Sequence, residues 1–230
     1  MSFFQKITKA VCIGRNYADH VKELGNELPK QPFFFIKPRS AVLAPGQGPI
    51  LRPKGVQLHY ELELGVVIGK EAKNINPANF TMAQADQYIA GYTVGLDLTA
   101  RNVQASAKKA GLPWSAAKGF DTFLPLSDFI PKAKIPNPDD AWLQLKVNNE
   151  IRQNDSTNLM IHKIPQLIAF ISNIMTLEEG DVVMTGTPKG VGEIVPGDVL
   201  RGVVMSNKEV VGELNTSVAD KPGYYEFRED

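Results

Sequence analysis

Two acidic residues stand two positions apart in a segment typical of a β-strand, which runs from His59 to Gly69 (HYELELGVVIG). Successive side chains of a strand point to opposite faces of the sheet, so Glu61 and Glu63 share one face, with His59 beside them. The residues after Glu63 are apolar, which indicates that the strand crosses the protein interior. Buried carboxylates are costly unless they are paired, so the two acids predict a positive partner close by.

A second strand-like segment, Tyr92 to Thr99 (YTVGLDLT), contains a third acid. Asp97 lies there in apolar surroundings, and Arg101 follows it. Three carboxylates with no cysteine and few histidines nearby form an all-oxygen ligand set, which suits a hard divalent cation such as Mg²⁺ or Mn²⁺. Spacing alone leaves open the alternative that Glu61 and Glu63 mark a solvated strand face.

A histidine and a glutamate near the N-terminus form a second candidate pair. His20 and Glu23 lie three residues apart in a predicted short helix over Ala18–Leu24, which follows a predicted strand over Ala10–Gly14. Residues at this spacing are neighbours on a helix surface. The carboxylate would orient the imidazole as a general base, and the alternative is a surface ion pair. A short helix between glycine-containing turns is also typical of a mobile lid.

A glycine-rich turn over residues 186–192 (GTPKGVG) follows a predicted strand over 181–185. It lacks the spacing of a phosphate-binding P-loop, so nucleotide hydrolysis is a weaker hypothesis. Its backbone N–H groups and Thr187 are able to hold a carboxylate. Lys118 lies in a loop-like stretch of small and aromatic residues, where a lysine usually buries its stem and keeps its charged end in water.

These residues must be positioned by short strands, frequent glycine and proline turns, and few helices. Helices are expected over 77–90, 102–110 and 164–174, a buried strand over Phe33–Pro38, and a hairpin over 143–153 that turns at Asn148-Asn149. This pattern predicts a mostly β fold with added helices, of the α+β class. We expect residues 1–55 to form a small N-terminal segment that carries the lid helix, and residues 56–230 to form the catalytic domain.

Composition describes an ordinary globular chain of 230 residues, with 43% hydrophobic residues, 22% charged residues and no formal net charge. Balanced charge without basic clusters argues against nucleic-acid binding. No apolar run approaches the ~18 residues of a membrane span. The single cysteine, Cys12, lies in an apolar run, which predicts a buried thiol and fits a reducing compartment.

Six blocks, in their order along the chain, resemble the fumarylacetoacetate hydrolase family: IGRNYADHVKELG, FFFIKP, HYELELGVVIG, GLDLTARNVQ, GLPWSAAKGFD and VVMTGTPKGVG. They look most similar to the short, single-domain members that act on acylpyruvates and oxaloacetate. The resemblance covers nearly the whole chain, from about Ala10 to Asp230. It implies a mixed β-sandwich roll and a homodimer.

The resemblance also implies roles for individual residues. Glu61, Glu63 and Asp97 match the ligands of Mg²⁺ or Mn²⁺. The other matches are the water-activating pair His20 and Glu23 on a lid that orders when ligand binds, Lys118 beside the metal, and the substrate-binding positions Arg15, Lys37, Arg101, Gln104 and Thr187. One departure is Tyr60, where a second histidine is expected after His59. Its side chain is predicted to face away from the acids.

The expected activity is Mg²⁺- or Mn²⁺-dependent chemistry on small 2-oxo acids through an enolate. The main hypothesis is hydrolytic carbon–carbon cleavage of acylpyruvates, such as acetylpyruvate and fumarylpyruvate, together with oxaloacetate decarboxylation. The alternatives are an oxaloacetate enol–keto tautomerase and a non-catalytic module that binds a metal or a ligand. A mitochondrial matrix location is expected if the source is eukaryotic, and a cytoplasmic one otherwise.

Overall fold

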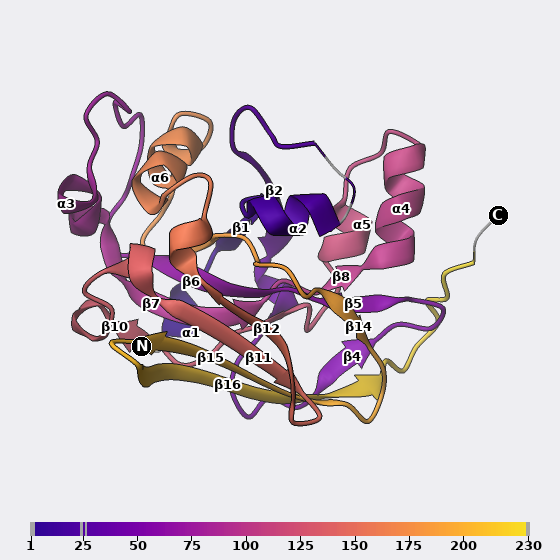
Figure 1. Cartoon of the computed structure of the whole chain (residues 1–230). Helices are drawn as coiled ribbons and strands as arrows, with labels where there is room; N and C mark the ends of the chain where they lie inside the picture. Colours follow the sequence, from indigo (N-terminus) through magenta and orange to yellow (C-terminus); the bar gives the residue numbers. More distant parts are fainter. Residues whose placement is uncertain (1–2, 24, 26, 229–230) are drawn as a thin grey trace.

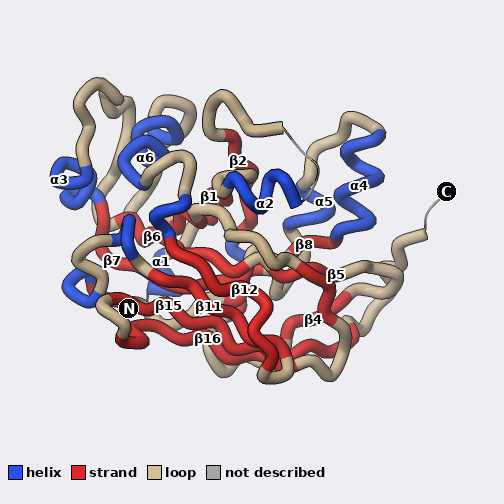
Figure 2. The backbone as a smooth tube through the Cα atoms, viewed as in Figure 1, coloured by secondary structure: helices blue, strands red, loops and turns tan. Residues whose placement is uncertain are grey.

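The computed structural model describes residues 3–23, 25 and 27–228, and most of its regular structure is β-strand, as the sequence predicts (Figures 1 and 2). The largest sheet has the strand order β10-β7-β6-β13-β1-β2. Its strands are β1 (Lys9–Gly14), β2 (Phe33–Pro38), β6 (Leu62–Ile68), β7 (Ile89–Leu96), β10 (Ile130–Pro131) and β13 (Val182–Met184). Within it only β1 and β13 pair in parallel.

A second sheet with the order β12-β11-β15-β16-β4 forms the opposite layer (Figure 1). Its strands are β4 (Ile50–Arg52), β11 (Trp142–Val147), β12 (Glu150–Ser156), β15 (Val199–Ser206) and β16 (Glu209–Asp220). Two small sheets complete the strands: β5 (Leu58–Tyr60) with β8 (Thr99–Ala100) and β14 (Gly192–Ile194), and β3 (Val42–Leu43) with β9 (Leu124–Pro125). The core lies between the two large sheets, where β6 is buried along its whole length.

The helices are short, and most of them lie on the side of the six-stranded sheet that faces away from β15 and β16 (Figure 2). They are α1 (Phe3–Lys6), α2 (Ala18–Glu23), α3 (Met82–Ala85), α4 (Arg101–Lys109), α5 (Ser115–Lys118) and α6 (Ile164–Ser172). Single 3₁₀ turns cover Arg39–Ala41, Asp86–Tyr88, Lys132–Lys134, Pro138–Asp140 and Thr157–Leu159. Among the described residues, no helix is long and apolar enough to cross a membrane.

Leu62 fixes the direction in which its two acidic neighbours point. Its side chain packs against Gly202 of β15, where an added Cβ would lie only 2.6 Å from Leu62 Cδ1. Because side chains alternate along an extended chain, Glu61 and Glu63 must then face away from the five-stranded sheet. The core contact between the sheets therefore places both acids on the other side, toward the helices.

Three expectations about elements are corrected. The strand predicted over 59–69 is broken at Glu61, because β5 pairs with β8 and β14 whereas β6 pairs with β7 and β13. The helix predicted over 77–90 is limited to α3 and a 3₁₀ turn, because Ile89 already pairs with Ile68 in the sheet. The strand predicted as buried, β2, is an edge strand, so Ile36 is 39% exposed while Lys37 is fully buried.

Features governed by local sequence agree with expectation. The Asn148-Asn149 turn joins β11 to β12, and both asparagines have the positive φ values, 49° and 68°, of a tight hairpin turn. The predicted helix over Ala18–Leu24 is observed as α2, and Leu24 lies outside the described residues. Cys12 is buried, as predicted. The boundary at residue 55 stays a prediction, and strands from both sides of it share the six-stranded sheet.

Candidate active site

Glu61, Glu63 and Asp97, here called the acidic triad, converge where β6 and β7 pair at one end. Leu62 lies opposite Leu96 in this antiparallel pair, and Asp97 N donates a hydrogen bond to Glu61 O at 2.8 Å. One carboxylate oxygen from each acid lies within 4.8 Å of the others, and all three side chains are buried. The i, i+2 spacing thus keeps both glutamates together even though the strand is broken at Glu61.

Three cations, here called the triad cations, contact two of the acids. Lys118 Nζ lies 2.9 Å from Glu61 Oε2 and 3.0 Å from Asp97 Oδ2. Arg101 Nη2 lies 2.7 Å from Glu61 Oε1, and Lys37 Nζ lies 2.9 Å from Asp97 Oδ1. Although burial alone would raise the pKa of Glu61, Lys118 and Arg101 hold that pKa well below its usual range.

Lys118 is fully buried in α5 rather than partly exposed in a loop, which corrects the expectation for this segment. Burial opposes its charged form, but the carboxylates of Asp97 and Glu61 outweigh burial and raise the pKa of the ammonium. The side chain also lies 4.7 Å from the centre of the Phe35 ring, a favourable cation–π contact. Lys118 is therefore held as a permanent positive charge between two of the acids.

Glu63 differs from the other two acids because no described lysine or arginine forms an ion pair with it. Its Oε2 accepts a hydrogen bond of 2.8 Å from Gly186 N, in the glycine-rich turn. Burial, together with the neighbouring Asp97 and Glu61, raises the pKa of Glu63 well above its usual value. Without an added cation, this acid is the one least able to ionise.

Asp97 has two lysines nearby but lacks a hydrogen-bond donor at one of its oxygens. Lys37 lies near Asp97 Oδ1, but it donates hydrogen bonds to the carbonyl oxygens of Leu98 and Phe123 at 2.7 and 2.6 Å. As a result Asp97 Oδ1 is buried and, among the described residues, accepts no well-directed hydrogen bond. A hard divalent cation bound by the acidic triad would satisfy this oxygen and allow Glu63 to ionise, so the ligand set fits Mg²⁺ or Mn²⁺.

His20 and Glu23 are joined as their spacing predicts. His20 Nδ1 lies 3.2 Å from Glu23 Oε2, and the imidazole is buried. Glu23 also accepts a hydrogen bond of 3.0 Å from Gly190 N, and Asp19 of the same helix pairs with Lys189 at 3.0 Å. Helix α2 is therefore attached to the glycine-rich turn, and no described residue forms a hydrogen bond with His20 Nε2.

One cavity gathers most of the predicted site residues. Its lining includes Arg15, His20, Glu61, Glu63, Asp97, Arg101, Gln104, Lys118 and Thr187. Glu23 lies behind His20, and Lys37 lies behind Asp97, so neither lines the cavity. Tyr60 is also absent from the lining, in agreement with its predicted direction.

Arg101 and Gln104 are held together on the first turn of α4. Arg101 Nη1 donates to Gln104 Oε1 at 2.7 Å, while its Nη2 contacts Glu61. His59 lies beside this guanidinium, with Arg101 Nε 3.5 Å from His59 Nδ1. Burial and the charge of Arg101 lower the pKa of His59 to about 4, so His59 is neutral at pH 7.

An aromatic wall, which sequence reasoning missed, forms one side of the cavity. Phe33 and Phe35 of β2 both lie near the Trp114 ring, at centroid distances of 5.9 and 5.8 Å. Residues i and i+2 of a strand share a face, which was a usable signal. The role of Trp114 was not predictable, because it depends on where the segment before α5 folds back onto β2.

Gln153 is a second residue that sequence reasoning missed. It is completely buried beside an irregularity of β12, one residue after Arg152. Its Oε1 accepts from Leu62 N at 2.9 Å and its Nε2 donates to Thr187 Oγ1 at 2.8 Å. Thr187 Oγ1 in turn donates to Leu62 O at 2.8 Å, so the peptide between the two glutamates is held from both sides.

The fold and the site together define a class of protein. The family profile described as "Fumarylacetoacetate (FAA) hydrolase C-terminal" matches residues 9–219. The chain therefore belongs to the fumarylacetoacetate hydrolase family. A crystal structure of yeast ynq8, a member of this family, has a TM-score of 0.91 and 39% identity and covers 99% of both chains, which confirms the predicted fold.

Individual relatives show which members of this family the chain is similar to. The mitochondrial oxaloacetate tautomerase oaa1 of Schizosaccharomyces pombe is 49% identical over 201 residues, or 87% of this chain and 90% of that protein. The mitochondrial oxaloacetate decarboxylase of Dictyostelium discoideum is 48% identical over 86% of this chain and 89% of that protein. A crystal structure of Pseudomonas aeruginosa fumarylpyruvate hydrolase, in complex with Mn²⁺ and pyruvate, has a TM-score of 0.82 and 33% identity, and covers 94% of this chain and 91% of that one.

Proposed function

We propose that this protein is a Mg²⁺- or Mn²⁺-dependent oxaloacetate tautomerase, which interconverts the enol and keto forms of oxaloacetate. The observation that carries this proposal is the meeting of the acidic triad, the His20–Glu23 pair and Lys118 in one cavity. Relatives at 48–49% identity that are named for oxaloacetate chemistry support this substrate over acylpyruvates.

The acidic triad would hold the metal, and the bound ion would polarise the keto group of a 2-oxo acid as a Lewis acid. Thr187, at the cavity wall, would hold the substrate carboxylate next to that keto group. Its hydroxyl hydrogen is directed at Leu62 O in the structure, so it must turn toward the cavity to donate to a ligand. Arg101 and Gln104 lie on α4 beside Glu61 and would orient the same end of the substrate.

Enolisation requires a base at C3 and a positive charge near the C2 oxygen. His20 Nε2 would accept the C3 proton while Glu23 holds Nδ1, and the C–H electron pair becomes the C2=C3 double bond. The negative charge that develops on the C2 oxygen would be stabilised by the ammonium of Lys118. The C2 oxygen takes a proton from solvent to complete the enol, and His20 returns the C3 proton to solvent, so no net proton is gained or lost. Ketonisation is the reverse.

Decarboxylation is the second candidate, because one relative is named for it. Loss of CO₂ from oxaloacetate breaks the bond between C3 and C4 and needs no base at C3. Hydrolysis of an acylpyruvate instead needs an activated water at the distal carbonyl. The substitution His20→Ala therefore distinguishes tautomerisation from decarboxylation. It should slow tautomerisation by about 100-fold or more and leave decarboxylation less affected.

The experiment is a side-by-side rate measurement with Mg²⁺. Loss of the ultraviolet absorbance of enol-oxaloacetate, formation of pyruvate from oxaloacetate, and cleavage of acetylpyruvate are followed separately for the same enzyme preparation. We expect enol loss to be the fastest of the three. A wild-type protein that fails to accelerate enol loss beyond Mg²⁺ alone would disprove the proposal.

The two relatives named for oxaloacetate chemistry are mitochondrial by name. We infer the same compartment for this chain if its source is eukaryotic, and the cytoplasm otherwise. The homodimer implied by the resemblance to the family stays a prediction, and sedimentation equilibrium would measure it as twice the chain mass of 25.3 kDa.

A further inference from the structure

Arg15 lines the cavity and, unlike Arg101 and Lys118, has no acidic partner among the described residues. The triad cations contact Glu61 or Asp97, whereas Arg15 forms no ion pair in this part of the chain and is half-buried at the cavity wall. Its guanidinium carbon lies 5.6 Å from the centre of the Phe33 ring. A cation supported by an aromatic face, whose donors reach no acceptor among the residues that the structure describes, is prepared to bind an anion.

The backbone around Arg15 is built to hold it in this place. Arg15 has φ 56°, a left-handed conformation that is unfavourable for a residue with a side chain. Asn16 fixes the following peptide, because its side chain donates to Thr185 O and His162 O and accepts from His162 N at 2.8–3.0 Å. Backbone strain of this kind persists where the surroundings determine it, and it is common at ligand sites.

Gly14 makes the support of Arg15 possible. A Cβ at this position would lie 2.3 Å from Phe33 Cζ, so the ring occupies the space that a side chain would fill. Phe33 thereby reaches the cavity wall and carries the guanidinium on its face, while its other neighbour is Trp114. The segment Gly14-Arg15-Asn16 thus acts as one unit that presents a cation to the cavity.

Formal charges indicate what this cation would bind. The three negative charges of the acidic triad balance the three positive charges of the triad cations. A bound divalent metal therefore leaves the interior with a net charge of about +2, and Arg15 and the exposed Lys108 add to it at the cavity wall. Such a site favours a substrate with two negative charges.

We propose that Arg15 binds the carboxylate that lies farthest from the metal, and that it thereby selects dicarboxylic 2-oxo acids over 2-oxo acids with an uncharged tail. This inference rests on the proposed function, because it takes one end of the substrate to be held by the metal and Thr187. The carboxylate next to the keto group is engaged there in every 2-oxo acid. Only a second carboxylate gives Arg15 a partner.

The test compares Arg15→Gln, Arg15→Lys and wild type with substrates that differ only at the tail. For Arg15→Gln we expect kcat/KM for oxaloacetate to fall roughly tenfold to hundredfold, as for a lost charge-assisted hydrogen bond. The value for acetylpyruvate should change less than about twofold. Arg15→Lys should recover part of the loss, because it restores the charge but not the planar donors.

A binding measurement separates this inference from the proposed activity. Calorimetry on the Mg²⁺-loaded protein compares oxalate, which has only the chelating unit, with malate, which has both carboxylates of oxaloacetate and cannot enolise. Arg15→Gln should weaken malate and spare oxalate, even if the wild type proved not to be a tautomerase. Equal losses for both ligands would overturn the inference.

Two lysines of α4 supply further variants for the binding and kinetic measurements. Lys109→Gln, one residue beyond Lys108 and outside the cavity lining, should behave like wild type toward all ligands. Lys108→Gln tests the neighbouring cation of the wall. If Lys108→Gln, and not Arg15→Gln, produced the difference between malate and oxalate, the assignment to Arg15 would be wrong.

Discussion

At the scale of single residues, Glu63 has the most unusual environment in the site. Gly186 N is its hydrogen-bond donor, and burial together with Asp97 and Glu61 raises its pKa. Its negative charge is therefore a cost to the metal-free protein and a benefit only when a cation is bound. Stability and metal binding should respond in opposite directions when that charge is removed.

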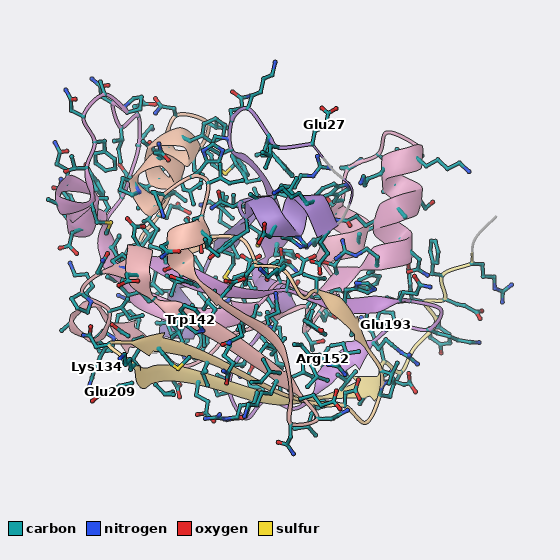
Figure 3. All side chains as sticks on the ribbon, viewed as in Figure 1. Glu27, Lys134, Trp142, Arg152, Glu193 and Glu209 are labelled. Atoms are coloured by element: carbon teal, nitrogen blue, oxygen red, sulfur yellow. The ribbon has the colours of Figure 1, made fainter. Side chains whose placement is uncertain are left out.

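We expect Glu63→Gln to abolish the increase in melting temperature that Mg²⁺ gives, because a metal ligand is lost. The melting temperature in EDTA should stay unchanged or rise, since the amide oxygen can still accept from Gly186 N and the buried charge is gone. Thermal unfolding in EDTA and in excess Mg²⁺ measures both effects. Glu193→Gln, an exposed glutamate on β14 (Figure 3), is the matched control and should keep the wild-type response.

A second prediction at this scale concerns acid stability away from the site. Glu213 accepts two hydrogen bonds from Arg201, at 2.9 and 2.7 Å, and one from Asn215, and these donors lower its pKa from 4.5 to about 2. A lowered carboxyl pKa stabilises the fold above pH 4.5, and this stabilisation is lost as the pH falls from there toward 2. Because the pair is exposed, its contribution should be at most about 1 kcal/mol.

Glu213→Gln should therefore unfold at a slightly lower temperature than wild type at pH 7, and the difference should shrink as the pH falls below 4.5. Calorimetric melting at a series of pH values measures it. A difference that stayed constant down to the lowest pH at which the protein folds would show that the ionised pair has no stabilising role.

At the scale of elements, the hairpin β11–β12 supports the acidic triad through Gln153. Gln153→Met keeps the side-chain volume but leaves Leu62 N without its acceptor and Thr187 Oγ1 without its donor. We expect Mg²⁺ affinity to fall about 10- to 100-fold, as for other residues that orient metal ligands. Titration calorimetry measures the affinity, and Gln144→Met, on the neighbouring strand β11 at the surface, is the matched control.

The result for Gln153→Met distinguishes a side chain that positions the acidic triad from one that only stabilises the fold. A Gln153→Met protein that melted earlier but bound Mg²⁺ with wild-type affinity would show that the amide supports only the fold. Recovery of Mg²⁺ affinity when Gln153 is restored in the same background would exclude an unrelated defect.

The glycine-rich turn and the lid helix form the second coupling between elements. Gly190 has φ 92°, and a Cβ there would lie 2.1 Å from Arg152 O, so Gly190→Ala must displace the turn that donates to Glu23. We expect kcat/KM to fall about tenfold to hundredfold through misplacement of His20, with little change in Mg²⁺ affinity. Steady-state kinetics and calorimetry on the same variant measure the two quantities.

Gly197 provides a control of the same backbone type. It has φ 97°, and nothing lies within 4 Å of an added Cβ. Gly197→Ala therefore imposes the left-handed strain without a clash, and it should retain wild-type kinetics. Equal losses in both variants would mean that backbone strain, and not the contact with Arg152, is responsible.

The packing of the elements also explains which features of the site and fold could be predicted from the sequence. The acidic triad was predictable because the i, i+2 spacing survives a break in the strand, and the His20–Glu23 pair because its spacing is local to one helix turn. Gln153 was not predictable, since its role depends on a strand irregularity far along the chain. The exposure of Ile36 likewise depends on which strand ends the sheet.

At the scale of the whole molecule, a bound metal should stabilise the folded chain by mass action. At a Mg²⁺ concentration of 100 times the dissociation constant, the expected gain of about 2.7 kcal/mol corresponds to an increase of roughly 5–10 °C in melting temperature for a chain of this size. A titration of melting temperature against Mg²⁺ measures the gain, and EDTA should reverse it. A melting temperature that does not depend on Mg²⁺ or Mn²⁺ would argue against a metal site formed by the acidic triad.

The triad cations also bear on the order of folding and metal binding. In small zinc domains the free energy of metal binding is the free energy of folding, so the chain collapses only when the ion arrives. Here the triad cations already pair with Glu61 and Asp97, so we expect the polypeptide to reach its folded shape without the metal. Metal loading would then be a late step, separable in time and place from synthesis, and a freshly made molecule would wait in an inactive but intact form until the ion is supplied.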